Sequence, residues 1–342
     1  MRVRGAVVVG LLLLATGCSG DSDEPAAPPT SSEPSSPTES TRTPTERSAP
    51  PPPPDPVSLP ALMAKTYDGH GLRVHDELLR TDAYTRHAVT YRSGDLRISG
   101  IMNIPNGRGP FPALVLNHGY IDPSYYVTGQ GLAREQDYLA RAGYVVLHTD
   151  YRDHAGSDSA PGSERRLRLG YTEDVINAVL ALKRYGRPTV DADRIGLLGR
   201  SMGGGVTYNA LVVRPGLVDA AVVYASVSSH TADNFNRWIR GERTELARWI
   251  IDEYGSPERS PKFWRGVSPY TYFDRITEPI LVHHGKIDDT CPLRWTYRTV
   301  DELRRLGKDV RLRLYEGEGH TFYADWTQSM RRTVRFLDSQ LA

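Results

Sequence analysis

The sequence predicts an α/β fold in which a mostly parallel sheet of about eight strands is flanked by helices. Two observations lead to this prediction. From residue 86 onward, short apolar and β-branched segments alternate with segments of helical spacing. One further segment, residues 226–272, is too long for a simple crossover between two strands. Strict alternation places parallel strands in one sheet with helices on both faces, and the long segment would then be a helical cap insertion.

The expected strands are short apolar runs. They are residues 87–91, 96–104, 113–117, 144–148, 195–198, 220–224, 280–283 and 310–315. The first two flank Ser93-Gly94, which signals a hairpin, and would form an antiparallel edge. The expected helices cover residues 130–142, 172–185, 202–213, 293–306 and 327–341. Thr172 precedes acidic residues and is therefore expected to cap its helix.

The segment 226–272 is rich in Arg and Trp and lies between two expected strands. In folds of this class, ligand sites lie outside the carboxyl ends of the strands. An insertion at such an end would cover the site as a cap. Its tryptophans fit ordinary packing between cap and core equally well.

The charge balance argues against a nucleic-acid partner. Lys and Arg number 42, Asp and Glu number 41, and the net charge is +1. Binding to nucleic acid usually needs a basic face or stripe. The chain has two cysteines, Cys18 and Cys291, and modification of the first would leave the second without a disulfide partner. The sequence predicts no oligomeric state.

The first 18 residues have the pattern of a secretory signal peptide. Two arginines precede an apolar run over residues 6–14 that is too short to span a bilayer. Ala15-Thr16-Gly17-Cys18 then resembles the bacterial lipoprotein signal, although Ala15 stands where leucine is usual. We expect export, lipidation at Cys18 and anchoring to the cell-surface membrane. The alternative is a plain signal peptide and a secreted protein.

Residues 19–60 are rich in Pro, Ser, Thr and Glu, with almost no large apolar side chain. Such a segment buries too little surface to offset the entropy of ordering, so we expect a disordered linker. The folded domain is expected over residues 61–342.

Gly199-Arg200-Ser201-Met202-Gly203 matches the pattern G-x-S-x-G between an expected strand and an expected helix. In such a turn the serine stands at the tip in a strained conformation, and the glycines let neighbouring backbone pass closely. The start of the helix directs free N–H groups at the reacting atom. Ser201 is therefore the predicted nucleophile, and the N–H of Met202 is a predicted oxyanion donor. The alternative is a glycine-rich turn with no catalytic role.

A serine nucleophile needs a base and an acid that orients it, in the chain order Ser, Asp, His. "ILVHHGKIDDTCP" carries Asp288 and Asp289, and "LYEGEGHTF" carries His320; both follow expected strands. His320 is the predicted base. A metal site at His283 and His284 is disfavoured, because adjacent strand residues point to opposite faces. No metal or organic cofactor is expected.

The second oxyanion donor should come from the loop after the third expected strand. That loop is residues 117–120, "NHGY", and it nominates the backbone N–H of Tyr120. A contribution from the Tyr120 hydroxyl stays open.

These motifs together resemble the α/β-hydrolase superfamily, and within it the catalytic domain of the prolyl oligopeptidase serine peptidases and the related dienelactone-hydrolase-like esterases. The shared motifs are H-G-Y at residues 118–120, G-x-S-x-G-G at 199–204, H-G-x-x-D-x-x-C-P at 284–292 and E-G-x-G-H at 316–320. The resemblance covers residues 86–340 and assigns the acid to Asp288. It implies a serine hydrolase that cleaves a small peptide or ester substrate through an acyl-enzyme.

Two other functions are compatible with the sequence. One is a carboxylesterase that acts on small acyl esters, because the same triad serves both reactions and the fold does not fix the substrate. The other is a non-catalytic surface binding lipoprotein, which the intact triad disfavours. Arg152 lies in the charged stretch 148–158, where it either meets a substrate carboxylate or pairs with Asp150 or Asp153.

Overall fold

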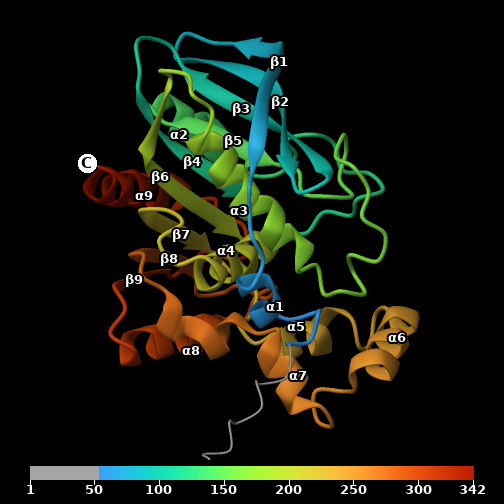
Figure 1. The fold of residues 1–342 in the computed structure, drawn as a ribbon. Helices are drawn as coiled ribbons and strands as arrows, with labels where there is room; N and C mark the ends of the chain where they lie inside the picture. The colour runs from blue at the N-terminus through green and yellow to red at the C-terminus, as the bar shows by residue number, and fades with distance from the viewer. Residues whose placement is uncertain (1–53) are drawn as a thin grey trace, which may run out of the picture. The chain divides into compact units, whose positions relative to one another are not determined.

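The computed structural model describes residues 54–342 (Figure 1). The expected signal peptide and most of the expected linker lie outside the described residues. Within residues 54–342, nine strands form one sheet in the order β1-β2-β3-β5-β4-β6-β7-β8-β9. Their bounds are β1 His70–Arg80, β2 Tyr84–Ser93, β3 Leu96–Pro105, β4 Phe111–Asn117, β5 Val145–Thr149, β6 Val190–Arg200, β7 Ala220–Tyr224, β8 Ile280–Gly285 and β9 Val310–Tyr315.

The sheet is mixed. The pairs β1–β2, β2–β3 and β3–β5 are antiparallel, and all other neighbouring strands are parallel. This arrangement confirms the predicted fold class. Sequence reasoning missed β1, which forms one edge of the sheet and whose residues, "HGLRVHDELLR", are mostly exposed. Because β1 has no continuous buried face, it lacks the apolar run by which the other strands were found.

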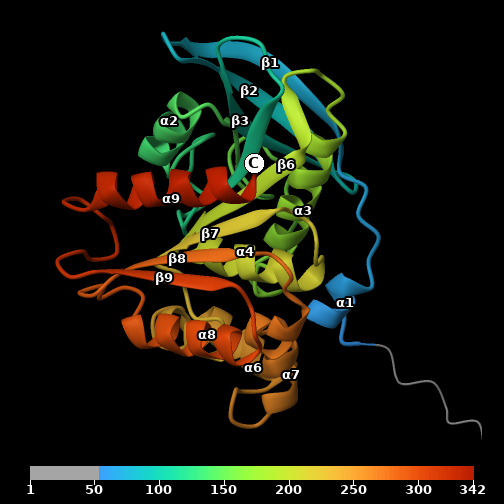
Figure 2. The same ribbon diagram turned by 90° about the vertical axis from the view of Figure 1, so that its left-hand side faces the viewer.

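Helices cover both faces of the sheet. Their bounds are α1 Leu59–Met63, α2 Ala133–Arg141, α3 Gly170–Lys183, α4 Met202–Val213, α5 Thr231–Trp238, α6 Thr244–Tyr254, α7 Pro261–Gly266, α8 Leu293–Arg305 and α9 Trp326–Gln340, with a 3₁₀ helix η1 over Pro269–Arg275. Helices α3, α4 and α8 pack on one face, and α2 and α9 pack on the other (Figure 2). In the part of the chain that is described, no helix is long and apolar enough to cross a membrane.

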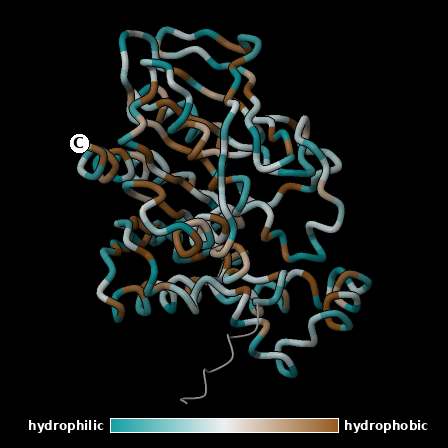
Figure 3. The backbone as a smooth tube through the Cα atoms, viewed as in Figure 1, coloured by the Kyte–Doolittle hydropathy of each residue, from teal (hydrophilic) through white to brown (hydrophobic). Residues whose placement is uncertain are grey.

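Each face of the sheet has its own hydrophobic core, and the central strands contribute to both. Along β4, Ala113 and Val115 join the core under α3 and α4, whereas Leu114 and Leu116 join the core under α2 and α9. Successive strand residues point to opposite faces, so a strand covered on both sides is apolar at every position. In Figure 3, hydrophobic segments lie mainly in the interior of the fold.

The predicted hairpin is present as β2–β3, with its turn one residue later than the expected Ser93-Gly94. Ser93 pairs with Leu96, which leaves Gly94-Asp95 as a two-residue loop. Gly94 has φ of 59°, a conformation in which glycine is favoured because it has no Cβ.

Two expected boundaries were wrong. Helix α3 begins at Gly170, and the Thr172 hydroxyl, buried inside the helix, has no hydrogen-bond partner and caps nothing. Helix α1 begins at Leu59, inside the segment expected to be a linker as far as residue 60. The Ser58 hydroxyl caps α1 by accepting the Ala61 N–H at 3.1 Å, and Leu59 is fully buried. Two buried leucines in an otherwise polar stretch therefore extend the folded part towards the N-terminus.

The segment 226–272 contains α5, α6, α7 and part of η1, and it connects β7 to β8. Its helices lie beyond the carboxyl ends of the parallel strands (Figure 1). Trp264 is buried against Phe235 and Phe263, so this tryptophan packs the segment together.

Arg152 has a different partner from those expected. Its guanidinium binds the Asp174 carboxylate on α3 at 2.8 Å, and it lies 3.7 Å from Glu173. Asp150 instead accepts hydrogen bonds from other side chains, and Asp153 accepts one from a serine hydroxyl. The Arg152 side chain is 13% exposed and the Asp174 side chain is fully buried. Arg152 is therefore engaged in a structural ion pair.

We predict that Asp174→Asn lowers the free energy of unfolding by about 3 kcal/mol, because it removes the buried counter-ion of Arg152 and leaves only the more distant, partly exposed Glu173. Urea unfolding measures the effect. The matched control is Glu77→Gln, which removes an exposed pair with Arg80 and should leave the unfolding midpoint almost unchanged. Equal losses in the two variants would contradict a stabilising role for the buried pair.

Candidate active site

Ser201 occupies a sharp turn between a strand and a helix. Strand β6 ends at Arg200, α4 begins at Met202, and Ser201 lies between them with φ of 56° and ψ of −122°. Residues other than glycine rarely adopt this conformation, and it persists only where the surrounding structure enforces it. One such restraint is the Ser201 N–H, which donates to the Tyr224 carbonyl at 3.0 Å.

The glycines of the motif lie where backbone passes too closely for a side chain. A Cβ on Gly203 would collide with the Asn117 carbonyl, and one on Gly199 would collide with the Gly203 carbonyl. A Cβ on Gly119 would lie 3.2 Å from the Cβ of Ser201. The turn itself therefore requires glycine at 199, its close approach to the end of β4 requires glycine at 203, and a side chain at 119 would be tightly packed against Ser201.

Asp288 and His320 meet at the ends of neighbouring strands. Asp288 follows β8, His320 follows β9, and His320 Nδ1 lies 2.9 Å from Asp288 Oδ2. The other carboxylate oxygen accepts the N–H groups of Thr290 at 2.9 Å and Cys291 at 2.8 Å. An ionised carboxylate only accepts, so this contact places the imidazole proton on Nδ1 and leaves Nε2 as an acceptor.

The environment keeps Asp288 ionised. Burial works to raise its pKa, but the hydrogen bonds from His320 and from the Cys291 N–H outweigh this effect. The pKa of Asp288 therefore lies below its usual range.

Asp289 has different surroundings. Its side chain is exposed, and its carboxylate accepts the Thr290 hydroxyl at 3.2 Å. Of the two neighbouring aspartates, Asp288 is the one that contacts His320.

His284 is a second imidazole beside Asp288, and sequence reasoning considered it only as a metal ligand. Its Nε2 lies 3.4 Å from Asp288 Oδ2 and donates to the Cys291 carbonyl at 2.9 Å. Its Nδ1 accepts the Thr296 hydroxyl at 2.7 Å. Burial lowers the pKa of His284, so its ring is neutral. The ring lies beside the same Asp288 carboxylate oxygen that contacts His320.

His283 points to the opposite face of β8. Its Nδ1 lies 2.7 Å from the Tyr315 hydroxyl, and its Nε2 lies 3.1 Å from the Thr333 hydroxyl. The two adjacent histidines therefore share no ligand position. Among residues 54–342, no group of three or more His, Cys, Asp or Glu side chains is arranged to hold a metal ion.

Hydrogen bonds join the three loops that carry the predicted residues. The Ile287 N–H donates to the Glu318 carbonyl at 3.1 Å, and the buried Glu318 carboxylate accepts two N–H groups of the loop that follows His320. Arg200 donates to the His320 carbonyl at 3.3 Å and lies 3.5 Å from Glu135. The contacts between different loops join residues far apart in the sequence, so no local motif predicts them.

A cavity of about 620 Å³ opens beside these loops. Ser201, His320, Tyr120 and Met202 all line it, and Asp288 lies behind His320. Met202 is the first residue of α4, so its N–H has no acceptor within the helix. Tyr120 directly follows Gly119, which lies against Ser201.

The outer walls of the cavity are largely apolar. They come from the loop before α3 and from the cap, residues 226–272. The apolar side chains are those of Leu167, Leu169, Val227, Phe235, Trp238, Ile239, Leu246 and Val267. Such walls favour the binding of a ligand that carries an apolar group.

One carboxylate links the two sides of the cavity. Glu164 accepts from Arg168 at 2.7 Å and from Arg243 of the cap at 2.7 Å. The Arg168 guanidinium lies over the Tyr120 ring, 4.5 Å from its centroid. Although burial works to raise the pKa of Glu164, the two guanidinium groups lower it to about 2. Glu164 and Arg243 are 79 residues apart, and sequence reasoning missed both.

Comparisons with known proteins identify relatives. The model of the prolyl oligopeptidase family matches residues 131–342. The Bacillus subtilis (strain 168) protein named "Uncharacterized peptidase YtmA" is 25% identical over 255 residues, which cover 73% of this chain and 91% of that protein.

Solved structures share the fold. The uncomplexed acylaminoacyl peptidase of Pyrococcus horikoshii aligns with a TM-score of 0.60 and 22% identity, over 77% of this chain and 42% of that one. Acetyl xylan esterase 1 from Thermoanaerobacterium sp. JW/SL YS485 aligns with a TM-score of 0.56 and 17% identity, over 78% of this chain and 88% of that one. The chain thus spans less than half of the acylaminoacyl peptidase and most of the esterase.

The family model covers more than half of the chain. The protein is therefore a serine hydrolase that belongs to the prolyl oligopeptidase family.

Proposed function

We propose that Ser201, His320 and Asp288 form a catalytic triad that hydrolyses peptide, amide or ester bonds through an acyl-enzyme. One observation carries the proposal. His320 is paired to the buried Asp288 at 2.9 Å and lines the same cavity as a serine held at φ of 56°. A nucleophile, a base and a group that orients the base are the minimum for this chemistry.

The proposed reaction has two halves. The Ser201 Oγ attacks the carbonyl carbon while His320 Nε2 takes its proton, and His320 then protonates the leaving amine or alcohol. Water next attacks the acyl-enzyme, His320 takes the proton of the water, and the acid departs as Ser201 recovers its proton. Asp288 holds the imidazole in the required tautomer and stabilises the imidazolium that forms in each half.

The negative oxygen that develops during each attack needs hydrogen-bond donors. Tyr120 and Met202 line the cavity next to Ser201, and we propose their backbone N–H groups as the donors. Each donor of this kind is worth about 3 kcal/mol of transition-state stabilisation.

The proposed substrate is a small peptide with an apolar side chain or acyl group. The apolar cavity walls and the cap support it, because they enclose a limited volume next to Ser201. The proposal of peptidase activity rests on the family and on the name of the Bacillus subtilis relative. The alternative is a carboxylesterase, which the shared fold with an acetyl xylan esterase supports.

Export and lipidation at Cys18 are also proposed. Both rest on the sequence pattern of residues 1–18, which lie outside the described residues. A lipid at Cys18 would hold the hydrolase at a membrane surface.

We predict that aminoacyl anilides with apolar side chains are hydrolysed faster than p-nitrophenyl esters of short acids, relative to the uncatalysed rate of each. Both substrate sets are assayed with one protein preparation. A fluorophosphonate should also label the protein, and Ser201→Ala should abolish both the label and the hydrolysis. Ser228→Ala, which alters another serine of the same cavity, is the control and should retain the label. Hydrolysis of esters alone would establish the carboxylesterase instead.

Asp288→Asn should reduce kcat by about 10⁴-fold, because the amide no longer enforces the tautomer or stabilises the imidazolium. Asp289→Asn is the matched control and should leave kcat nearly unchanged, since its side chain is exposed and bonds only to Thr290. Steady-state kinetics on one substrate compares the two variants. Similar losses in both would leave Asp288 without its proposed role.

Mass spectrometry of the mature protein should show acyl chains on an N-terminal Cys18. Cys18→Ala should abolish the modification and shift the protein from the membrane fraction to the soluble fraction. An N-terminus without acyl chains in the unsubstituted protein would rule out the lipid anchor.

A further inference from the structure

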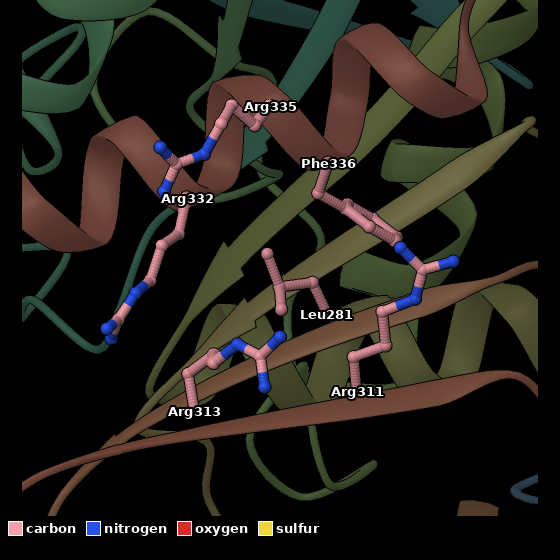
Figure 4. A pocket seen from close by; sticks show the side chains of 6 residues that line it. All are labelled: Leu281, Arg311, Arg313, Arg332, Arg335 and Phe336. Atoms are coloured by element: carbon pink, nitrogen blue, oxygen red, sulfur yellow. The ribbon is translucent and has the colours of Figure 1, made fainter.

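A second cavity, of about 400 Å³, lies between α9 and the edge strand β9. It is lined by Arg311, Arg313, Arg332 and Arg335, with Leu281 and Phe336 between them (Figure 4). We call this cavity the arginine groove. It shares no lining residue with the cavity that contains Ser201.

Secondary structure sets the guanidinium groups in two facing rows. Arg311 and Arg313 are two residues apart on β9 and so project from the same face of the strand. Arg332 and Arg335 are three apart on α9 and so are neighbours on one side of the helix. Figure 4 shows the helix and strand side chains on either side of Leu281.

The charge of the groove is not neutralised within the protein. Within the described part of the chain, the only carboxylate within 4.0 Å of these four guanidinium groups is Asp309, which lies 3.4 Å from Arg311. The acid of α9, Asp338, instead bonds to the Tyr144 hydroxyl. The whole chain carries a net charge of only +1, so this concentration of positive charge does not follow from its composition.

The groove is also partly preorganised. The Arg311 guanidinium lies 5.3 Å from the Phe336 ring centroid, and that of Arg332 lies 5.2 Å from the Tyr315 ring centroid. Stacking on aromatic rings restricts these two side chains before anything binds. The floor is apolar, since Leu281 and Phe336 are 2% and 4% exposed. An apolar floor strengthens the attraction between the arginines and an anion.

We propose that the arginine groove binds an anion that carries two or more phosphoryl groups. A guanidinium presents a planar pair of N–H donors that matches the oxygens of a phosphoryl group. A phosphoryl group carries a charge of about −1.5 to −2, so two of them balance four arginines. The two facing rows suit a ligand with two charged centres better than a single carboxylate.

Two sources share this chemistry. One is a free diphosphate or polyphosphate, and the other is a cluster of anionic phospholipid headgroups. The experiment below uses one arm for each source.

Isothermal titration calorimetry with inorganic pyrophosphate tests the first source on the full mature chain carrying Cys18→Ser. Pyrophosphate should bind with one ligand per chain at low ionic strength and more weakly as salt is added. Arg313→Gln combined with Arg335→Gln should weaken the affinity at least about 10-fold, because charge-assisted hydrogen bonds are lost. These two arginines are chosen because, among residues 54–342, the aromatic and carboxylate contacts of the groove belong to Arg311 and Arg332.

Arg108→Gln combined with Arg187→Gln is the matched control, since both side chains are exposed, neither lines the groove, and the change in net charge is the same. This control variant should bind pyrophosphate with the same affinity as the unsubstituted groove. Both double variants should hydrolyse substrate at the parent rate, which also shows that they fold.

Cosedimentation with vesicles tests the second source. Vesicles of phosphatidylglycerol and phosphatidylcholine are compared with vesicles of phosphatidylcholine alone. Binding to the anionic vesicles that requires the groove arginines and is displaced by pyrophosphate supports the headgroup source. Pyrophosphate binding that requires the groove, without such vesicle binding, supports a free anion. No binding in either arm, or binding that the groove substitutions leave unchanged, would overturn the proposal.

Discussion

The close approach of the serine turn to the end of β4 is the contact on which the rest of the site depends. Gly203 lies against the Asn117 backbone so tightly that any side chain would collide with it. The same approach brings Gly119 beside Ser201 and aligns the start of α4 with the loop that carries Tyr120. Glycine within a helix costs roughly 1 kcal/mol relative to alanine. That cost is offset by a geometry in which the strained Ser201, Tyr120 and Met202 line one cavity.

The sheet register explains why two residues far apart in the chain meet at 2.9 Å. Strands β8 and β9 are parallel, and Gly285, the last residue of β8, pairs with Tyr315, the last residue of β9. The loops that follow therefore start at the same level, and each carries its functional side chain a few residues later. A Cβ on Gly285 would collide with the Glu318 carbonyl, so the two loops also pack backbone against backbone. Asp288 and His320 are held by this packing as well as by their own hydrogen bond.

Local signals predicted most of the fold and the residues that the structure gathers around the cavity. Strands buried on both faces are continuous apolar runs, and a strand-to-helix turn has a recognisable glycine pattern, so β6, Ser201 and α4 were readable directly. Parallel strands end at the same edge of the sheet, so the residues that directly follow these strands were the candidates for the functional site. The features that sequence reasoning missed depend on tertiary structure. Strand β1 has no buried face, and Arg152 pairs with Asp174 on a helix whose position the sequence does not encode locally. The same holds for the contact of Glu164 with Arg243, which spans 79 residues.

The arginines of the protein fall into two groups with different electrostatic surroundings. Every arginine that lines the cavity containing Ser201 has a carboxylate partner: Arg168 and Arg243 share Glu164, and Arg200 lies 3.5 Å from Glu135. These contacts offset most of the positive charge of the three arginines, and the contact of Arg243 with Glu164 ties the cap to the loop before α3. The arginine groove has four guanidinium groups and one carboxylate at its rim. Repulsion among like charges destabilises such a cluster unless counter-charge arrives from outside. A fold that gives each arginine of one cavity a carboxylate partner, but provides one carboxylate for the four arginines of the groove, leaves a site for an external anion at the groove.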